Sequence, residues 1–223
     1  MRTACVIPAL NEAERVAAVV AGCRRLNFPV YVVDDGSTDR TAAVAAEAGA
    51  VVVRHEANRG KGAALASGAE RAAADGFEAV AFLDADGQHD PGELPALLAA
   101  AEAGADVVVG CRRLDEKMPL VRRWTNRFTS WVLSRLAGRR LSDTQSGFRV
   151  VRLAAWKLAR PESGRFAAES EMLVRAARAG LRISEVPVST IYAGETSHVR
   201  PLRDTWRFFA LVSRLAFSRG KRS

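Results

Sequence analysis

Two short apolar segments of this chain are each followed by paired carboxylates. Val32 and Val33 precede Asp34 and Asp35, and an apolar run over 79–83 precedes a second acidic pair. Open α/β sheets bind their ligands beyond the carboxyl ends of the strands, so we expect both acidic strand ends to meet at one site. Carboxylates in that position suit a divalent cation and a polyphosphate.

The second acidic segment predicts a metal site. Asp84, Asp86 and Gln88 place three oxygen-bearing side chains on alternate residues. Mg²⁺ or Mn²⁺ binds one or two carboxylates together with the oxygens of a diphosphate, and stabilises the charge of a departing nucleoside diphosphate. A solvated acidic turn is the alternative for a lone Asp-x-Asp. The position after an apolar strand and the presence of the other acidic strand end favour metal.

Two further turns suggest contacts to a nucleotide. Asp35 could accept hydrogen bonds from a base or ribose, as acidic residues at strand ends do in dinucleotide folds. Gly36 and Ser37 fit ordinary turn and capping chemistry. Lys61 lies in Arg-Gly-Lys-Gly at the start of a predicted helix, where a cation and free backbone N–H groups favour phosphate. The spacing is not that of a P-loop.

The elements that must position these residues follow an alternating pattern. Apolar runs alternate with alanine-rich stretches, which predicts βα units and a mostly parallel sheet. We expect strands at 3–9, 29–33, 51–54, 79–83, 107–111 and 183–191, and a helix at 169–179. Residues typical of helix starts and stops lie between them: Asn11, Ser37 or Thr38, and Asp90 at starts, and Gly49, Gly76 and Gly104 at stops.

Composition indicates one domain with two differently charged halves. The 223 residues contain 48% hydrophobic residues and no Gly/Ser-rich or Pro-rich linker, which fits a single α/β domain over 1–223. Residues 1–110 carry 9 basic and 16 acidic side chains (net −7), whereas 111–223 carry 24 basic and 9 acidic ones (net +15). We therefore expect a metal-binding half joined to a half that meets an anionic surface or substrate.

The basic half also contains two amphipathic helical patterns. One carries Leu120, Trp124, Phe128 and Trp131 on one face, and the other places arginines opposite apolar residues over 202–216. Such helices lie at membrane interfaces or pack on the sheet or on a second subunit. Three widely spaced cysteines predict buried thiols in a reducing compartment. We expect no signal peptide, because an apparent strand begins almost at once, and no apolar stretch is long enough to span a bilayer.

These motifs, in this order, resemble the family 2 glycosyltransferases. The segments that carry the resemblance are Pro8 with Asn11-Glu12, Val33–Ser37, Arg59–Gly62, Leu83–Gln88 and Val109–Arg112. The later segment Asp143–Arg149 resembles the subgroup of dolichyl-phosphate mannose and glucose synthases. The resemblance covers most of the chain and implies a single GT-A-like α/β domain with C-terminal amphipathic helices, in which 1–110 binds nucleotide-sugar and metal and 111–223 faces the acceptor.

The same resemblance implies roles for individual residues. Those expected to bind the donor are Pro8, Asn11, Glu12, Asp35 and Lys61 for the nucleotide, and Asp84, Asp86 and Gln88 for metal and diphosphate. Those expected near the phosphates of donor and acceptor are Arg112, Arg122 and Arg149, and Ser146 is expected to bind substrate. Glu169 and Glu171 lie where the family has a general base for a hydroxyl acceptor, although a helix start also favours carboxylates. His198 falls where relatives have a loop that closes over the donor.

The expected reaction is an inverting, Mg²⁺- or Mn²⁺-dependent transfer of a hexose from UDP-glucose or GDP-mannose to a polyprenyl phosphate. We expect it on the cytoplasmic side, with the protein peripheral at the inner membrane face. A hydroxyl acceptor on a glycan or lipid is the alternative, with one of the two glutamates as base. A sugar nucleotidyltransferase would need a Gly-rich N-terminal loop that 8–12 lacks. Basic charge with aromatics permits nucleic-acid binding, but no nucleic-acid motif accompanies it, so we expect no such partner. The sequence leaves the oligomeric state open.

Overall fold

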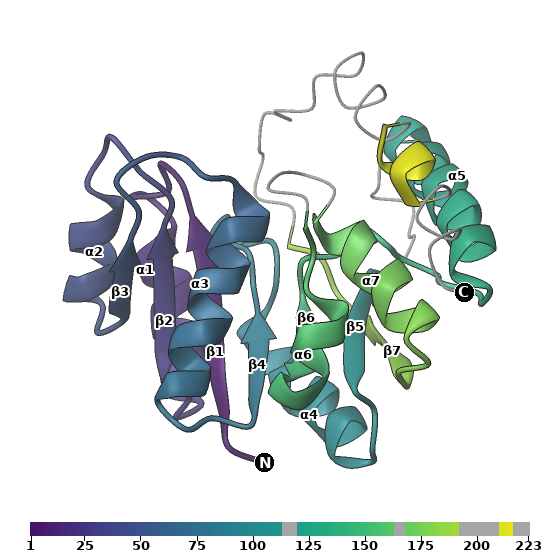
Figure 1. Cartoon of the computed structure of the whole chain (residues 1–223). Helices are drawn as coiled ribbons and strands as arrows, with labels where there is room; N and C mark the ends of the chain where they lie inside the picture. Colours follow the sequence, from purple (N-terminus) through teal and green to yellow (C-terminus); the bar gives the residue numbers. More distant parts are fainter. Residues whose placement is uncertain (113–119, 163–167, 192–209, 216–223) are drawn as a thin grey trace.

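The structure is a computed structural model that describes residues 1–112, 120–162, 168–191 and 210–215. These residues form one α/β domain around a seven-stranded sheet of order β3-β2-β1-β4-β6-β5-β7. The strands are β1 Thr3–Ala9, β2 Val30–Asp34, β3 Val51–Arg54, β4 Ala79–Phe82, β5 Val107–Arg112, β6 Arg149–Arg152 and β7 Ile183–Val188. Figure 1 shows the carboxyl ends of β1, β2 and β4 at one edge of the molecule.

The helices alternate with the strands, as the sequence pattern predicts. They are α1 Val16–Arg25, α2 Thr41–Glu47, α3 Lys61–Ala74, α4 Leu94–Glu102, α5 Leu120–Ala137, α6 Leu153–Ala159 and α7 Ala168–Arg178, with a 3₁₀ turn at Pro91–Glu93. The predicted stops at Gly49, Gly76 and Gly104 are confirmed, since each glycine has a positive φ just beyond a helix.

The strand β6 was not predicted, and it is the antiparallel member of the sheet. It pairs with β4 on one side and β5 on the other, while the other pairs are parallel. Four residues with an arginine at each end have no clear strand periodicity, which explains the omission. β7 ends at Val188, earlier than expected.

Two of the three predicted helix starts were wrong, and the residues involved form hydrogen bonds between two loops. α1 begins after Arg15, not after Asn11, and α2 begins after Arg40, not after Ser37 or Thr38. Instead the Asn11 N–H donates to Oγ of Ser37 (2.9 Å), and Oδ1 of Asn11 accepts from the Thr38 N–H (2.9 Å). These bonds tie the loop after β1 to the loop after β2. Asp90 does cap the turn that follows it, accepting from the Gly92 N–H at 2.8 Å.

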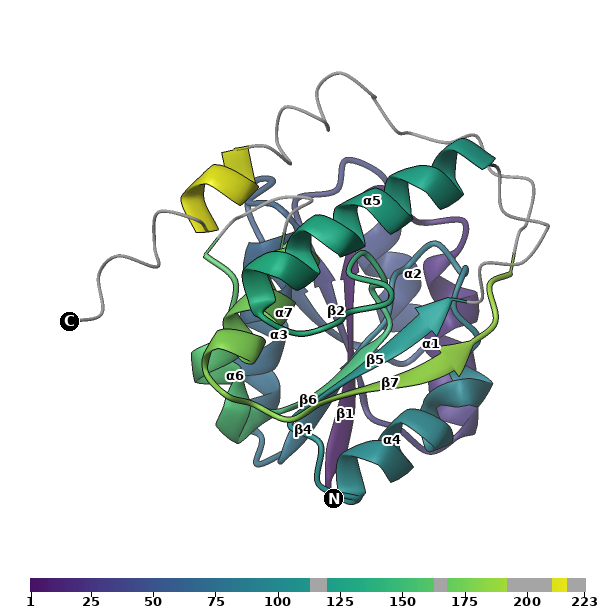
Figure 2. The same cartoon turned by 90° about the vertical axis from the view of Figure 1, so that its right-hand side faces the viewer.

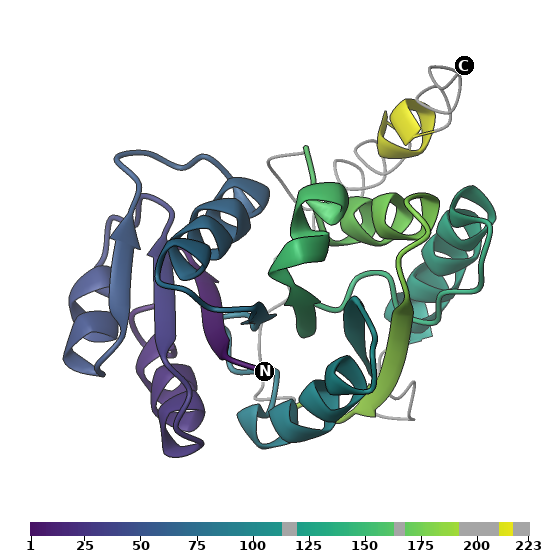
Figure 3. The same cartoon turned by 60° about the horizontal axis from the view of Figure 1, so that its bottom comes forward.

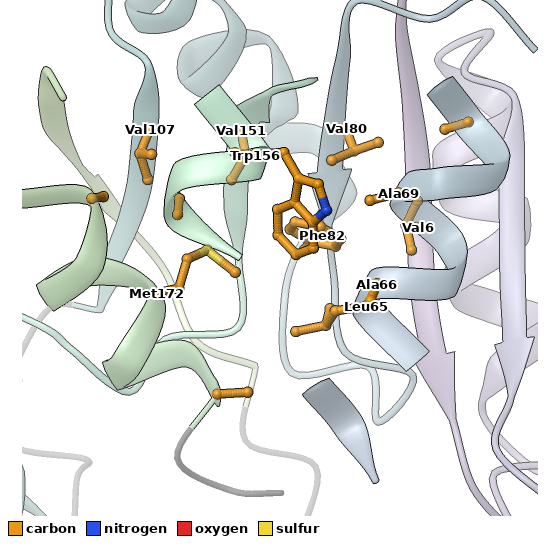
Figure 4. Close-up of a cluster of buried hydrophobic side chains, with 14 of the residues drawn as sticks. Val6, Leu65, Ala66, Ala69, Val80, Phe82, Val107, Val151, Trp156 and Met172 are labelled. Atoms are coloured by element: carbon orange, nitrogen blue, oxygen red, sulfur yellow. The ribbon is translucent and has the colours of Figure 1, made fainter. Parts of the chain in front are cut away.

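Hydrophobic side chains fill both faces of the sheet. α3, α6 and α7 cover one face and α1, α2 and α4 the other, and Figure 3 shows these two layers. On the first face Phe82 of β4 and Trp156 of α6 meet with ring centroids 5.4 Å apart, beside Leu65 of α3 (Figure 4). α3 and α6 thus share one cluster on the same side of the central strands, and α3 begins with Lys61.

The helix α5 lies outside these two layers. It packs against α7, and Figure 2 shows it on the outer side of the molecule. Leu133 joins Val174 of α7 and Leu211 and Leu215 of the segment 210–215 in a small separate cluster. Cys5 and Cys23 are buried, as the sequence predicts, and Cys111 is half-buried.

Candidate active site

Three segments that are distant in the sequence meet at Lys61. Its Nζ lies 2.5 Å from Oδ1 of Asp84, directly beyond β4, and also pairs with Oε1 of Glu169 in the first turn of α7. Burial opposes the charge of Lys61, but the two carboxylates outweigh it and raise the pKa of Lys61. Burial likewise opposes the charge of Asp84, yet Lys61 and His89 hold the pKa of that carboxyl well below its usual range. Lys61 and Asp84 are therefore both charged at neutral pH.

The acidic segment fits a divalent cation that takes further ligands from a substrate. Asp84 and Asp86 are both partly buried, and Oδ1 of Asp86 accepts the Gln88 N–H at 2.9 Å, which folds 86–88 into a tight turn. Within the described residues, no three His, Cys, Asp or Glu side chains gather as a complete metal site. Two carboxylates with an amide oxygen nearby are a hard, oxygen-only donor set, which fits Mg²⁺ or Mn²⁺ completed by a diphosphate.

His89, which sequence analysis gave no role, is part of this site. Its ring is buried against Phe148 with centroids 5.3 Å apart, and its Nε2 lies 3.6 Å from Oδ2 of Asp84. The other oxygen of Asp84 faces Lys61, so the carboxylate is held from both sides. His89 directly follows Gln88 in the sequence, which could have suggested a role. The sequence alone does not show on which side of the turn the ring lies.

Asp35 is directed into the protein. Its carboxylate accepts from Nδ1 of His55 (2.7 Å) and from the backbone N–H groups of Arg59 (2.9 Å) and Gly60 (2.7 Å). Nε2 of His55 in turn lies 2.9 Å from Oγ of Ser67 on α3. These bonds fix the turn that leads into Lys61. A direct contact of Asp35 with the nucleoside stays a prediction, and His55 is a residue that sequence analysis missed.

The other residues predicted for the nucleoside lie at the carboxyl edge of β1. Pro8 is in β1 opposite Val33 of β2, and Asn11 bridges to the next loop as described above. The Glu12 N–H donates to Oγ1 of Thr41 (2.8 Å), and its Oε2 accepts from Nε of Arg15 at 2.9 Å. The structure brings these three together beside the end of β2, and their role stays a prediction.

Arg112 ends β5 and is held by Asp143. Its Nε and Nη2 donate to the two carboxylate oxygens at 2.7 and 3.0 Å, and its backbone N–H lies 3.3 Å from the same group. Burial opposes the charge of Asp143, but Arg112 holds the pKa of that carboxyl below its usual value. This two-point contact orients the guanidinium rigidly. The motif 143–149 includes Asp143, but only the fold shows that Asp143 pairs with Arg112.

The loop 143–147 connects the arginine to the acidic side of the site. At its start Asp143 binds Arg112, and at its end Gly147 packs on Asp84 so closely that a Cβ there would stand 2.7 Å from Cγ of Asp84. Only glycine permits this approach. Ser146, predicted to bind substrate, is buried, and its Oγ accepts from the Phe148 N–H at 3.3 Å.

Two residues that were predicted to be catalytic direct their side chains to partners other than Lys61 and Asp84. Arg149 was expected to face phosphates, but its side chain is 1% exposed and donates to three backbone carbonyls. Glu171 lies two residues after Glu169, which on a helix directs it to a different face. Its Oε2 accepts from Nη2 of Arg214 (2.6 Å) and its Oε1 from the Glu162 N–H (3.1 Å). Of the two glutamates, the structure brings only Glu169 to Lys61.

Two predicted residues lie outside what the structure describes. These are the side chain of Arg122, in the first turn of α5, and His198. Most of the second amphipathic pattern, over 202–216, also lies outside it, apart from a helical turn at 210–215.

The fold and site together define a class of protein. An open, mostly parallel sheet with acidic strand ends, a lysine at a helix start and an arginine at the end of β5 is the arrangement of a GT-A-type glycosyltransferase. A family model described as "Glycosyl transferase family 2" matches residues 4–157. The chain belongs to this family and is a glycosyltransferase.

Known proteins similar to this chain include two transferases that are named for polyprenyl phosphates. The undecaprenyl-phosphate mannosyltransferase of Micrococcus luteus is 33% identical over 205 residues, 86% of this chain and 84% of its own. The dolichyl-phosphate N-acetylglucosaminyltransferase of Methanococcus voltae is 30% identical over 212 residues, 84% of each chain. A solved structure of glucosyl-3-phosphoglycerate synthase from Mycobacterium tuberculosis in complex with UDP superposes with a TM-score of 0.74 at 26% identity, covering 98% of this chain and 79% of that one.

Proposed function

We propose that this glycosyltransferase transfers a hexose, with inversion, from a nucleoside-diphosphate sugar to a polyprenyl phosphate at a membrane surface. The observation that carries the proposal is the loop 143–147, which contacts Arg112 at one end and Asp84 at the other. An anion-binding arginine and a metal-binding carboxylate are thus held in one rigid piece. A reaction between two phosphorylated substrates would use this juxtaposition to align them.

The donor would bind along the carboxyl edge of β1, β2 and β4. Asp84 and Asp86, with Gln88, would hold Mg²⁺ or Mn²⁺, which neutralises charge on the leaving diphosphate. The related structures of glucosyl-3-phosphoglycerate synthase solved with Mn²⁺ and UDP or UDP-glucose support this choice of metal and donor type. Lys61 would hold Asp84 and Glu169 in place and present its charge to the donor phosphates.

The transfer step needs no strong base when the acceptor is a phosphate. An ionised phosphate oxygen attacks the anomeric carbon, and the bond from that carbon to the diphosphate oxygen breaks, so that the nucleoside diphosphate leaves with the electron pair. Arg112 would orient the acceptor phosphate. Glu169 forms an ion pair with Lys61, so in this reaction it would orient Lys61 and would not accept a proton.

The membrane part of the proposal rests on the outer face of α5. Trp124, Phe128 and Trp131 are 73%, 52% and 57% exposed, at the spacing of one helix face. The guanidinium of Arg135 lies 5.2 Å from the centre of the Trp131 ring. Large aromatics beside arginines suit the interface of an anionic bilayer. On the basis of this exposed aromatic face, we propose peripheral binding at the cytoplasmic face. No described helix is both long and apolar enough to cross a bilayer.

A hydroxyl acceptor is the second candidate. It is favoured by the structural similarity to glucosyl-3-phosphoglycerate synthase, solved in complex with phosphoglyceric acid at 23% identity and a TM-score of 0.74. In that case Glu169, placed beside Asp84 through Lys61, would have to accept the hydroxyl proton.

One assay separates these candidates. Release of UDP or GDP is measured from UDP-glucose, UDP-N-acetylglucosamine and GDP-mannose with Mn²⁺ or Mg²⁺, alone, with a short polyprenyl phosphate, or with 3-phosphoglycerate. We expect release that depends on the polyprenyl phosphate. Release that requires 3-phosphoglycerate would select the hydroxyl acceptor, and absence of donor binding in every combination would refute the proposal.

Membrane binding has its own test, vesicle co-sedimentation. Replacing Trp124, Phe128 and Trp131 by serine should reduce binding to anionic vesicles while leaving turnover of a short, water-soluble acceptor unchanged. The control is Leu158→Ser, because Leu158 on α6 is a large hydrophobic residue of comparable exposure, 51%. Equal binding of the triple variant and the control would show that the α5 face is not the membrane contact.

A further inference from the structure

The guanidinium of Arg149 is buried and donates to backbone carbonyls from two segments. Nε donates to Ser146 (2.8 Å) and Nη2 to Thr144 (3.0 Å), both in the loop 143–147. Nη1 donates to the carbonyl of Glu169 (2.5 Å) at the start of α7. A single side chain therefore joins the loop to the helix. Ser170 adds a second link, since its Oγ donates to the same Thr144 carbonyl at 3.2 Å.

Each segment that Arg149 holds also carries a residue of the site. The loop holds Arg112 through Asp143 and touches Asp84 through Gly147, as described above. Glu169 pairs with Lys61. A shift of the loop against α7 would change the position of Arg112 relative to Lys61. Arg112 belongs to the predicted acceptor side and Lys61 to the donor side, so the two sides would move relative to each other.

Packing alone does not explain an arginine at this position. Within the described residues Arg149 forms no ion pair closer than 4 Å, so the cost of burying its charge is offset by hydrogen bonds to neutral carbonyls. Burial lowers the pKa of Arg149, while the fields of Glu169 and Asp143 act to raise it. An apolar side chain of similar volume would fill the same space at lower cost, but it would remove three hydrogen bonds to backbone carbonyls.

We propose that Arg149 is a positioning residue for glycosyl transfer, which locks the loop 143–147 to the start of α7 and so sets the position of Arg112 relative to Lys61. This inference rests on the proposed function for its kinetic consequence, but not for its structural one. Arg149 does not touch substrate in this arrangement.

The chain offers a matched control on the same strand. Arg152, at the other end of β6, also binds backbone carbonyls, with Nε to Ala105 (3.1 Å) and Nη2 to Ala101 (2.6 Å). Those carbonyls lie at the end of α4 and the start of β5, away from the carboxyl edge of the parallel strands. Loss of Arg152 should therefore destabilise the fold without moving the site.

The first arm of the test is amide hydrogen exchange of the full chain, which needs no substrate. Arg149→Met should accelerate exchange in 143–147 and 168–171, and Arg149→Lys, which can reach fewer carbonyls, should do so less. Arg152→Met should accelerate exchange near 101–106 and leave 143–147 unchanged. Unchanged exchange at 143–147 in Arg149→Met would overturn the proposal.

The second arm measures turnover with the donor and acceptor that the wild type accepts. We expect kcat to fall about 100-fold in Arg149→Met and about tenfold in Arg149→Lys, because small displacements of reacting groups have effects of this size. Arg152→Met should keep kcat within about threefold. Residues acting through one path are not additive, so Arg149→Met should cost little more in an Asp143→Asn background. If the two substitutions lower kcat by fully additive free energies, Arg149 and Asp143 do not act through the same loop.

The two arms separate failure of this inference from failure of the proposed function. If the wild type turns over no donor with any acceptor, the proposed function fails, and the exchange arm still decides whether Arg149 orders the loop. If turnover depends on polyprenyl phosphate but Arg149→Met matches Arg152→Met in both arms, the positioning role fails alone.

Discussion

The two sides of the site are built in different ways. On the donor side, carboxylates are held by backbone N–H groups close in sequence or in the adjacent loop, as Asp86 is by Gln88 and Asp35 by Gly60. On the acceptor side, Arg112 is held by a carboxylate 31 residues away, on a loop that is fixed by Arg149. Turns and neighbouring loops thus hold Asp86 and Asp35, whereas Arg112 depends on a loop that lies beyond α5. Asp84 pairs with Lys61 and packs on Gly147, so it lies where the two sides meet. We expect substitutions on the donor side to affect nucleotide and metal binding, and those on the acceptor side to affect transfer.

The largest effect is expected at Asp86. Asp86→Asn should reduce turnover by about 1000-fold, because one charged metal ligand and its electrostatic stabilisation of the leaving group are lost. Isothermal titration with UDP and Mn²⁺ should show the loss in binding as well. Asp90→Asn is the control, since Asp90 caps the next turn and an amide oxygen can still accept from Gly92. Unchanged metal-dependent binding in Asp86→Asn would place the metal elsewhere.

A second prediction concerns the point where the two sides touch. Gly147→Ala should displace Asp84 and lower turnover about 100-fold, because the new methyl group would overlap that carboxylate. The effect should appear in both donor affinity and kcat. Gly92→Ala is the control, where a Cβ would stand 3.1 Å from the exposed carboxylate of Asp90. An active Gly147→Ala enzyme would show that the contact between loop and metal ligand is dispensable.

Arg112 tests the acceptor side alone. Arg112→Lys keeps the charge but loses the two-point contact with Asp143, so kcat with the phosphate acceptor should fall by about 10- to 100-fold while donor affinity changes little. Arg54→Lys is the comparison on the donor side, where Arg54 lies 3.3 Å from Asp34 and is largely exposed. Steady-state kinetics with each substrate varied in turn would measure both. A loss of donor affinity in Arg112→Lys would contradict the division into two sides.

The smallest effect is expected at Tyr31, which supports β2 without touching the site. Burial, with a hydrogen bond to Asp75 (2.5 Å), raises the pKa of Tyr31 to about 12. The folded state therefore retains this proton better than the unfolded chain does. Its contribution to stability is complete below the unfolded pKa of about 10 and is lost as pH rises towards 12.

Tyr31→Phe should therefore lower stability at pH 8 slightly and flatten the loss of stability between pH 10 and 12. Urea unfolding at several pH values would measure both, with turnover at pH 8 unchanged. An unaltered alkaline profile would show that Tyr31 titrates as in the unfolded chain.

Much of the donor side could be predicted because its signals are local. An apolar strand followed by Asp-x-Asp, and a glycine-flanked lysine at a helix start, each occupy fewer than ten residues, and the structure brings Lys61 to Asp84. The acidic pair Asp84 and Asp86 lies beyond β4 as expected. His55 and His89 were missed because their roles depend on which way a side chain points from a turn.

The acceptor side was predicted less well because its contacts depend on where β6 lies. Asp143 was seen in a motif but was not paired with Arg112, and Arg149 was expected in the open site although it is buried beneath it. Glu171 was grouped with Glu169 by proximity in the sequence, whereas the helix separates them. In each case the sequence indicated a functional residue type, but it did not indicate where the side chain points in the fold.

The sequence by itself determined the α/β class, the order of most strands and helices along the chain, and the residue types at the acidic strand ends, because apolar periodicity and turn residues act over a few positions. Only the tertiary structure decided that β6 inserts antiparallel between β4 and β5. That insertion places the loop 143–147 between Arg112 and Asp84. Pairing of segments so far apart in the chain depends on the burial of both sheet faces together, which no local pattern encodes.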